Sequence, residues 1–389
     1  MFHGYQKNNR KKKIGGLSVR LLICAGGTGG GVYPAVVVLK QLMAGSTPPE
    51  VLWVGGEGGM EAELVTRAGI PYQAIPAAGV HGVGLRTLPG NLLQLLRGVF
   101  SARKILRSFR PDLLFFTGGY VAVPMAVAGL RVPSVLYVPD IEPGLALKTL
   151  ARFSDTIAVT AEESREYFPS HDHVMITGYP TRKELSTWAL GEARKALNLV
   201  PDLPTLLVFG GSKGARSINR ALFSVLPDLL AEIQIIHISG KLNWPEVETV
   251  QQTLTADLAK NYHAYPYLHA EMGAAFTAAD LVLSRAGASS LGEFPLFELP
   301  AILVPYPYAW RYQKVNANYL VKHGAAVLVK DADLPGRILP LVRELLQSNQ
   351  QLTAMSAAMK KLAYPHAALS IVKLLQNLVP LESALGSES

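Results

Sequence analysis

Two segments of the chain, 21–30 and 206–214, share one pattern, in which an apolar run is followed at once by a glycine-rich loop. The first reads LLICAGGTGG and the second LLVFGGSKG. Such a pattern is typical of a buried parallel strand that leads through a tight turn into a helix, the repeating unit of βαβ folds. Because the copies begin at residues 21 and 206 of 389, we expect one doubly wound domain in each half of the chain.

Short apolar runs at regular intervals predict the strands of both domains. The runs are 20–24, 51–54, 113–116, 134–138, 156–159 and 174–176 in the first half, then 205–209, 233–239, 262–265, 281–284, 301–304 and 326–329. The fold class is therefore α/β with two Rossmann-like domains. A turn at residues 178–180 places the boundary, so we expect domains at 18–180 and 181–364. A final helix within 365–380 is long enough to cross back to the first domain, and tails occupy 1–17 and 381–389.

The composition excludes several classes of protein. Hydrophobic residues form 49% of the chain and charged residues 17%, which excludes intrinsic disorder. Residues 1–17 are basic and lack the apolar stretch of a secretory signal, so we expect a disordered tail. The single cysteine, Cys24, cannot form an internal disulfide and indicates a reducing compartment. The uncharged stretch 113–130 is divided by glycines and Pro124, and we expect a strand, a loop and a helix there rather than a transmembrane segment.

Three glycine loops, at 26–31, 117–120 and 210–214, are candidates for phosphate binding. Glycine lets a phosphate approach the backbone closely, and the N–H groups at the start of a helix attract anions. The loops do not match the G-x-x-x-x-G-K-[ST] pattern of ATPases. The dinucleotide fingerprint is also incomplete, because Val32 stands where its third glycine should be. A nicotinamide or flavin enzyme is therefore disfavoured.

Taken together, four motifs resemble the MurG family. They are AGGTGG at 25–30, TGGYV at 117–121, GGSKGAR at 210–216, and RAGA at 285–288 followed by Glu293. The resemblance extends from about residue 19 to 375. It implies a GT-B glycosyltransferase, with two Rossmann-like domains facing a cleft, that acts in peptidoglycan synthesis. Such an enzyme transfers N-acetylglucosamine from its UDP donor, with inversion, to undecaprenyl-linked muramoyl-pentapeptide.

The resemblance also implies roles for individual residues. Ser212 and its loop would contact the donor diphosphate, Glu293 the ribose hydroxyls and Gln313 the sugar hydroxyls, with Arg182 close to the donor. Thr28, Gly29 and Gly30 would also be donor-binding residues, facing the acceptor diphosphate and the sugar side of the cleft. The remaining donor-binding residues that it implies are Ala288, Ser289, Ser290, Leu291 and Gly292. A carboxylate suits the ribose because it can accept two hydrogen bonds from a vicinal diol.

Three positions depart from the family pattern. Gly31 replaces a histidine, Asp140 stands at best where an asparagine is expected, and Tyr312 replaces another histidine. The residue that accepts the proton from the attacking hydroxyl therefore stays open, with Asp140, Glu142 and His81 as candidates.

We expect no metal or cofactor. The only D-x-D triplet, Asp331 to Asp333, precedes a helix at Leu334, and we interpret it as a helix cap.

The stretch 91–110 combines apolar residues at helical spacing with five basic residues and no acid. It predicts either a packed helix with a solvated basic face or, given a lipid-linked acceptor, a contact with an anionic membrane surface. We expect a peripheral protein on the cytoplasmic face of the cell membrane that binds no nucleic acid. Two alternatives stay open: a UDP-sugar transferase with another acceptor, and a UDP-sugar-binding homologue with impaired catalysis.

Overall fold

A computed structural model describes residues 19–26, 29–59, 61–78, 88–211, 214–308 and 311–378. The basic tail, Thr28, His81 and Ser212 lie outside these described residues. The contacts divide the chain into two compact units. The first unit joins 1–180 with 366–389, and the second is 181–365.

The first unit is built on a parallel sheet with the order β3-β2-β1-β4-β5-β6-β7. Its strands are β1 (Arg20–Ala25), β2 (Glu50–Gly56), β3 (Tyr72–Ile75), β4 (Leu113–Gly118), β5 (Ser134–Val138), β6 (Thr156–Val159) and β7 (Val174–Ile176). Its helices are α1 (Gly29–Met43), α2 (Glu61–Arg67), α3 (Leu88–Phe109), α4 (Ala122–Ala128), α5 (Leu145–Ala151), η1 (Glu162–Tyr167) and α16 (Ala367–Asn377). The strands form because their apolar residues are buried on both faces of the sheet.

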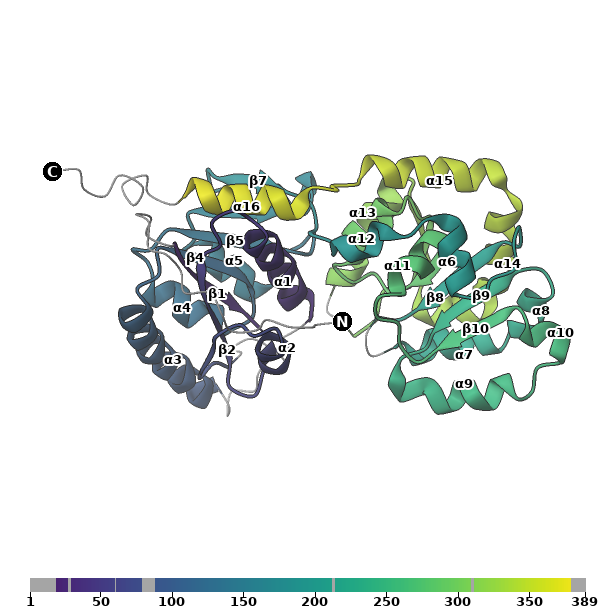
Figure 1. Cartoon of the computed structure of the whole chain (residues 1–389), viewed down its shortest axis with the longest axis horizontal. Helices are drawn as coiled ribbons and strands as arrows, with labels where there is room; N and C mark the ends of the chain where they lie inside the picture. The colour runs from purple at the N-terminus through teal and green to yellow at the C-terminus, as the bar shows by residue number, and fades with distance from the viewer. Residues whose placement is uncertain are drawn as a thin grey trace. The chain divides into compact units, whose positions relative to one another are not determined.

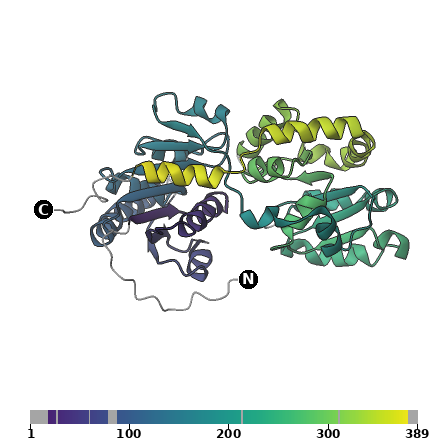
Figure 2. The ribbon, with the colours of Figure 1, turned by 45° about the horizontal axis from the view of Figure 1, so that its top comes forward.

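Alternate residues of each strand supply two different cores. Leu21 and Ile23 of β1 pack with residues of α1 and α16, whereas Leu22 and Cys24 pack with residues of α3, α4 and α5. The continuous apolar run of β1 thus serves two layers of helices. Helix α16 lies beside α1 although the two are far apart in the sequence, as Figures 1 and 2 both show.

The second unit repeats this plan with the order β10-β9-β8-β11-β12-β13, again parallel. Its strands are β8 (Thr205–Phe209), β9 (Gln234–Ile238), β10 (Tyr262–Tyr265), β11 (Leu281–Ser284), β12 (Ala301–Leu303) and β13 (Ala326–Leu328). Its longer helices are α6 (Leu190–Ala196), α7 (Arg216–Phe223), α9 (Trp244–Gln251), α11 (Met272–Ala278), α12 (Ser290–Leu296), α13 (Tyr312–Lys322), α14 (Leu334–Gln347) and α15 (Asn349–Lys361). The shorter ones are η2 (Lys183–Thr187), α8 (Leu226–Leu230), η3 (Lys241–Asn243), α10 (Ala256–Ala259) and η4 (Asp331–Asp333).

The structure confirms two doubly wound α/β units and every strand that the sequence predicted, and it adds β3. Among the described residues, no helix is long and apolar enough to span a membrane.

Candidate active site

Two glycine loops of the first unit meet at the edge where its strand order reverses. They follow β1 and β4, which are neighbours in the sheet, and ligands of open α/β folds bind at such a switch point. Gly119 has φ +86°, and a Cβ atom there would lie 2.5 Å from the Gly26 carbonyl oxygen. The hydroxyl of Thr117 donates to the Gly31 carbonyl oxygen at 2.6 Å. The loops are therefore held backbone against backbone, and glycine is required at 119.

Gly29 and Gly30 begin helix α1, next to this junction, while Thr28 lies outside the described residues. Gly31 is buried in the first turn of α1 and has no positive φ. A Cβ atom at Gly31 would lie 3.0 Å from the Thr117 carbonyl oxygen. The backbone conformation at position 31 would therefore allow a histidine. What limits a larger residue there is the space beside the Thr117 carbonyl oxygen.

The candidate bases differ in their surroundings. Asp140 is half-buried just beyond the end of β5. The Glu142 side chain is only 4% exposed and forms an ion pair with Lys148 at 3.6 Å. His81 lies outside the described residues.

The second unit contains a cavity of about 860 Å³ at its own switch point, between the loops that follow β8 and β11. Twenty described residues line it: Phe209, Gly210, Gly211, Gly214, Ala215, Arg216, Ser217, Leu242, Asn243, Ser284, Arg285, Gly287, Ser289, Ser290, Phe294, Tyr306, Pro307, Tyr308, Gln313 and Asp331. The volume is in the range of small-molecule sites. Ser212 falls within the loop after β8 but outside the described residues.

The glycine loop after β8 is fixed by close backbone contacts. Gly214 has φ +76°, and a Cβ atom there would lie 2.0 Å from the Ser239 carbonyl oxygen. Asn219 and Asn243 both donate to that same carbonyl. Asn219 in turn pairs with His237, whose pKa burial lowers to about 3. The neutral imidazole and the two amides thus support the loop from inside the domain.

The segment from Ala288 to Glu293 forms the turn into α12 and its first turn. Ser289 and Ser290 line the cavity, and the Ser290 hydroxyl donates to the Gly287 carbonyl oxygen at 2.6 Å. Ala288, Leu291 and Gly292 are buried beside them and do not line it.

Glu293 is half-buried and lies one turn beyond Ser289. Burial raises the pKa of its carboxyl group, while the Arg182 charge and a hydrogen bond from Ser289 act in the opposite direction. Arg182 and Glu293 are therefore neighbours, although neither is among the described residues that line the cavity.

Gln313 lines the cavity from the first turn of α13. Its Oε1 atom accepts a hydrogen bond from the Tyr306 backbone N–H at 2.8 Å. Because the carbonyl end of the side chain is engaged in this way, its amide group is the end that can donate to a ligand.

Several cavity residues carry no role in the sequence interpretation. Tyr306 and Tyr308 follow β12, with ring centroids 5.6 Å apart, and Leu242 follows β9. Arg285 was noted only as part of a motif. The signal that could have found them is their position directly after parallel strands, whose carboxyl ends share one edge of the sheet.

The D-x-D triplet differs from the predicted cap. Asp333 does occupy the N-cap position of α14, but its side chain makes no capping hydrogen bond. Asp331 instead forms an ion pair with Arg285 at 2.5 Å.

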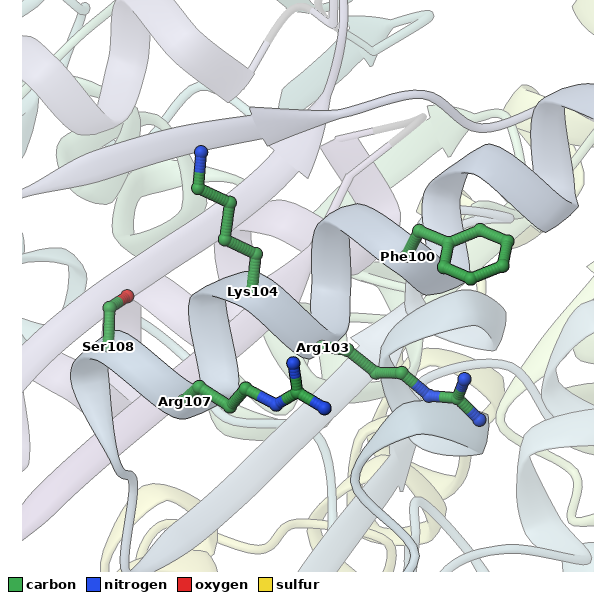
Figure 3. Close-up of a pocket in the computed structure, with 5 residues that line it drawn as sticks. All are labelled: Phe100, Arg103, Lys104, Arg107 and Ser108. Carbon is green, nitrogen blue, oxygen red and sulfur yellow. The ribbon is translucent and has the colours of Figure 1, made fainter.

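Helix α3 presents an exposed apolar and basic surface. Leu92, Leu93, Leu96 and Phe100 are between 49% and 68% exposed. Phe100, Arg103, Lys104, Arg107 and Ser108 border a shallow hollow and project outward from the helix (Figure 3). Ala102 and Ile105, together with half-buried Leu106 and Phe109, pack on the domain instead. Of the apolar residues at helical spacing, Ala102, Leu106 and Phe109 thus belong to the core, whereas Leu92 and Leu96 remain exposed.

Comparisons with known proteins agree with this geometry. Residues 21–159 match the glycosyltransferase family 28 N-terminal domain and residues 205–371 the C-terminal domain of that family. The UDP-N-acetylglucosamine--N-acetylmuramyl-(pentapeptide) pyrophosphoryl-undecaprenol N-acetylglucosamine transferase of Roseiflexus sp. is 38% identical, over 93% of this chain and 95% of its own length. The transferase of the same name from Desulforamulus reducens is 36% identical, over 93% and 99%.

Among solved structures, Acinetobacter baumannii MurG superposes with a TM-score of 0.74 at 27% identity, covering 92% of this chain and 99% of that one. The two Rossmann-like units are those of the GT-B fold class that the sequence predicted. The chain belongs to glycosyltransferase family 28 and, within it, to the MurG family.

Proposed function

We infer that the protein transfers N-acetylglucosamine from UDP-N-acetylglucosamine to undecaprenyl-linked muramoyl-pentapeptide in peptidoglycan synthesis. The observation that carries this inference is the match to transferases of that activity over 93% of the chain. The cavity at the switch point of the second unit offers a place for the nucleotide sugar.

We propose that donor recognition is divided among three groups. The loop of Gly210 to Gly214, with Ser212, holds the diphosphate, since backbone N–H groups can approach phosphate where side chains are absent. Glu293 accepts hydrogen bonds from the ribose diol, with Arg182 beside it. Gln313 donates from its amide to the sugar hydroxyls, because its carbonyl oxygen already accepts from Tyr306.

For the acceptor, we propose the junction of the two loops in the first unit. Gly29 and Gly30 at the start of α1, together with the backbone of Gly118 and Gly119, present N–H groups suited to a second diphosphate. Asp140 is better suited than Glu142 to accept the proton of the attacking hydroxyl. Glu142 is almost fully buried and ion-paired with Lys148, whereas Asp140 is only half-buried.

The decisive experiment supplies UDP-N-acetylglucosamine labelled in the sugar together with the muramoyl-pentapeptide lipid. We expect labelled disaccharide lipid and stoichiometric UDP. UDP release with other lipid or small-molecule acceptors alone would indicate a transferase with another acceptor. Tight UDP binding without turnover on any acceptor would indicate a homologue with impaired catalysis.

We propose further that the protein binds the cytoplasmic face of the membrane through α3. Its exposed leucines and Phe100 can enter the interface, and each nearby basic side chain contributes about 1 kcal/mol on an anionic surface. In the part of the chain that the structure describes, Arg103, Lys104 and Arg107 form no ion pair, so their charges are available.

The test is sedimentation with vesicles of phosphatidylcholine containing phosphatidylglycerol. Arg103→Glu with Arg107→Glu should greatly reduce the bound fraction. The control, Lys195→Glu with Arg337→Glu, makes the same change in charge at exposed positions of the second unit and should leave binding intact. Equal binding by both double variants would exclude α3 as the membrane contact.

A further inference from the structure

One wall of the cavity in the second unit is a closed group of three polar side chains. Asp331 Oδ1 accepts hydrogen bonds from Arg285 Nη1 at 2.5 Å and from the Ser217 hydroxyl at 2.8 Å. Arg285 Nη2 donates to the same Ser217 oxygen at 2.7 Å, which closes the ring. All three residues line the cavity.

These side chains join elements that are distant in the sequence. Ser217 lies in the first turn of α7, directly after the glycine loop of β8. Arg285 follows β11, and its Nη1 atom also donates to the Val304 carbonyl oxygen at the end of β12. Asp331 lies in η4, which follows β13. The group therefore ties together the carboxyl ends of four parallel strands around the cavity.

The guanidinium group of Arg285 also supports an aromatic side chain. Its carbon atom lies 5.3 Å from the centroid of the Tyr306 ring, within the range of a cation–π contact. Tyr306 is the residue whose backbone N–H holds Gln313. Arg285 is thus linked through Ser217 to the helix that follows the glycine loop, and through Tyr306 to Gln313.

The Arg285 side chain is only 9% exposed, so its charge needs a partner in the protein. Asp331 supplies that charge, and its side chain is 22% exposed. Without the carboxylate, the buried cation would turn toward water in the cavity and release Ser217 and Tyr306. Removal of the Asp331 carboxylate would then alter the geometry of the site rather than remove a direct contact with the ligand.

We propose that Asp331 is a positioning residue of the donor site, which holds Arg285 and Ser217 so that the glycine loop and Tyr306 frame the UDP-sugar. The proposal rests on the proposed function, because it takes the cavity as the donor site. It assigns a role to the D-x-D triplet, in which only the first acid acts.

The test compares Asp331→Asn with Asp333→Asn, a matched change two residues away at an exposed side chain that makes no capping bond. For Asp331→Asn we expect the Kd of UDP by calorimetry, and the KM for UDP-N-acetylglucosamine, to rise about tenfold or more. The acceptor KM should change by less than about twofold, because the change acts within the donor site. Asp333→Asn should match the wild type in each measurement.

A second variant separates positioning from direct binding by Arg285. Arg285→Lys keeps the charge, but a compact ammonium cannot reproduce a planar fork that reaches Val304, Asp331 and Ser217 together. Positioning predicts a loss of UDP affinity as large as that of Asp331→Asn. Retention of most of the affinity would instead mean that the charge alone matters, and would overturn the proposal.

Other outcomes bear on the proposal directly. A lower unfolding midpoint for Asp331→Asn with unchanged UDP affinity would reduce Asp331 to a structural residue. Loss of wild-type UDP binding on addition of EDTA would point to the acid as a metal ligand and overturn the positioning role. Wild-type protein that binds no UDP would contradict the proposed function itself, a failure distinct from normal binding by both the wild type and Asp331→Asn.

Discussion

At the scale of single residues, Gly31 shows how the structure changes a question that the sequence raised. The glycine stands where a histidine is expected, and its helical backbone would accept any side chain. The obstacle is the Thr117 carbonyl oxygen, 3.0 Å from a Cβ atom at 31. Substitution there must displace β4, on which the second glycine loop depends.

We therefore predict that Gly31→Ala lowers the free energy of unfolding by about 1 kcal/mol. The gain from replacing a helical glycine, roughly 0.5 to 1 kcal/mol, is outweighed by overpacking of about 1 to 3 kcal/mol. Gly336→Ala is the control, since a Cβ atom there meets nothing within 4 Å, and it should be neutral or stabilising. Urea unfolding of both variants measures the difference. If Gly31→Ala is instead more stable than the wild type, the Thr117 carbonyl group moves aside at little cost. In that case a histidine could be accommodated, and we would expect Gly31→His to raise turnover.

Glu293 gives a prediction about pH. Burial raises the pKa of its carboxyl group, so on acidification it takes up a proton at a higher pH than an ordinary glutamate. A protonated carboxyl group loses its charge-assisted bonds to the ribose, and UDP affinity should therefore fall as the pH drops through that raised pKa.

The measurement is the Kd of UDP by calorimetry from pH 8 to pH 5, for the wild type and Glu293→Gln. The glutamine variant should bind about tenfold more weakly at pH 8, because a charged acceptor contributes about 1.5 to 3 kcal/mol per bond. It should also lack the additional loss that Glu293 causes on acidification. Parallel pH profiles for the two proteins would remove Glu293 from the site.

At the scale of elements, apolar runs predicted the strands because parallel strands are buried on both faces. The search for apolar runs did not detect strand β3, and the reason is physical. It has four residues, two of them exposed, between Pro71 and Pro76 at the edge of the sheet, so it carries little apolar signal. In α3, the apolar positions could not be sorted by periodicity alone, since both the buried and the exposed face contain leucine and phenylalanine.

The candidate site, like the fold, has parts that the sequence could predict and parts that it could not. Glycine loops and their motifs have a local signature, and so the sequence could place them after β1, β4 and β8. The ring of Ser217, Arg285 and Asp331 has none, because its members are separated by 68 and 46 residues and meet only through the order of the strands. For this reason the sequence predicted only a helix cap at Asp331 to Asp333, whereas Asp331 forms an ion pair with Arg285.

The close approach of the loops after β1 and β4 depends on Gly119. Gly119→Ala should separate the loops after β1 and β4, because its Cβ atom would lie 2.5 Å from the Gly26 carbonyl oxygen. Gly58→Ala is a matched control with φ +71° and open space, so it reports only the cost of a positive φ. We expect Gly119→Ala to lose at least about 1 kcal/mol more stability than Gly58→Ala, and to raise the acceptor KM but not the Kd of UDP. Equal losses in thermal unfolding would mean that the loops part without strain.

At the scale of the whole molecule, the two units share one plan, and we propose different tasks for them. Each has buried apolar clusters of its own among the described residues, and each has glycine loops at its switch point. Every described residue that lines the cavity proposed for the donor belongs to the second unit. Nucleotide binding should therefore act first on that unit.

The resulting prediction concerns where UDP stabilises the chain. A ligand present at 100 times its Kd stabilises the state that binds it by about 2.7 kcal/mol. Hydrogen exchange followed by mass spectrometry should show this protection in peptides covering 205–217, 284–293 and 304–315. Core peptides of the first unit, such as 134–138, should exchange at the same rate with and without UDP. At the same UDP concentration the Asp331→Asn variant, with a Kd about ten times higher, should show protection reduced to about 1.4 kcal/mol. The reduction should affect all three peptides together, because the side-chain ring joins the elements they contain. Equal protection of both units in the wild type would mean that the two unfold as one cooperative body, and that the donor site cannot be treated as a property of the second unit alone.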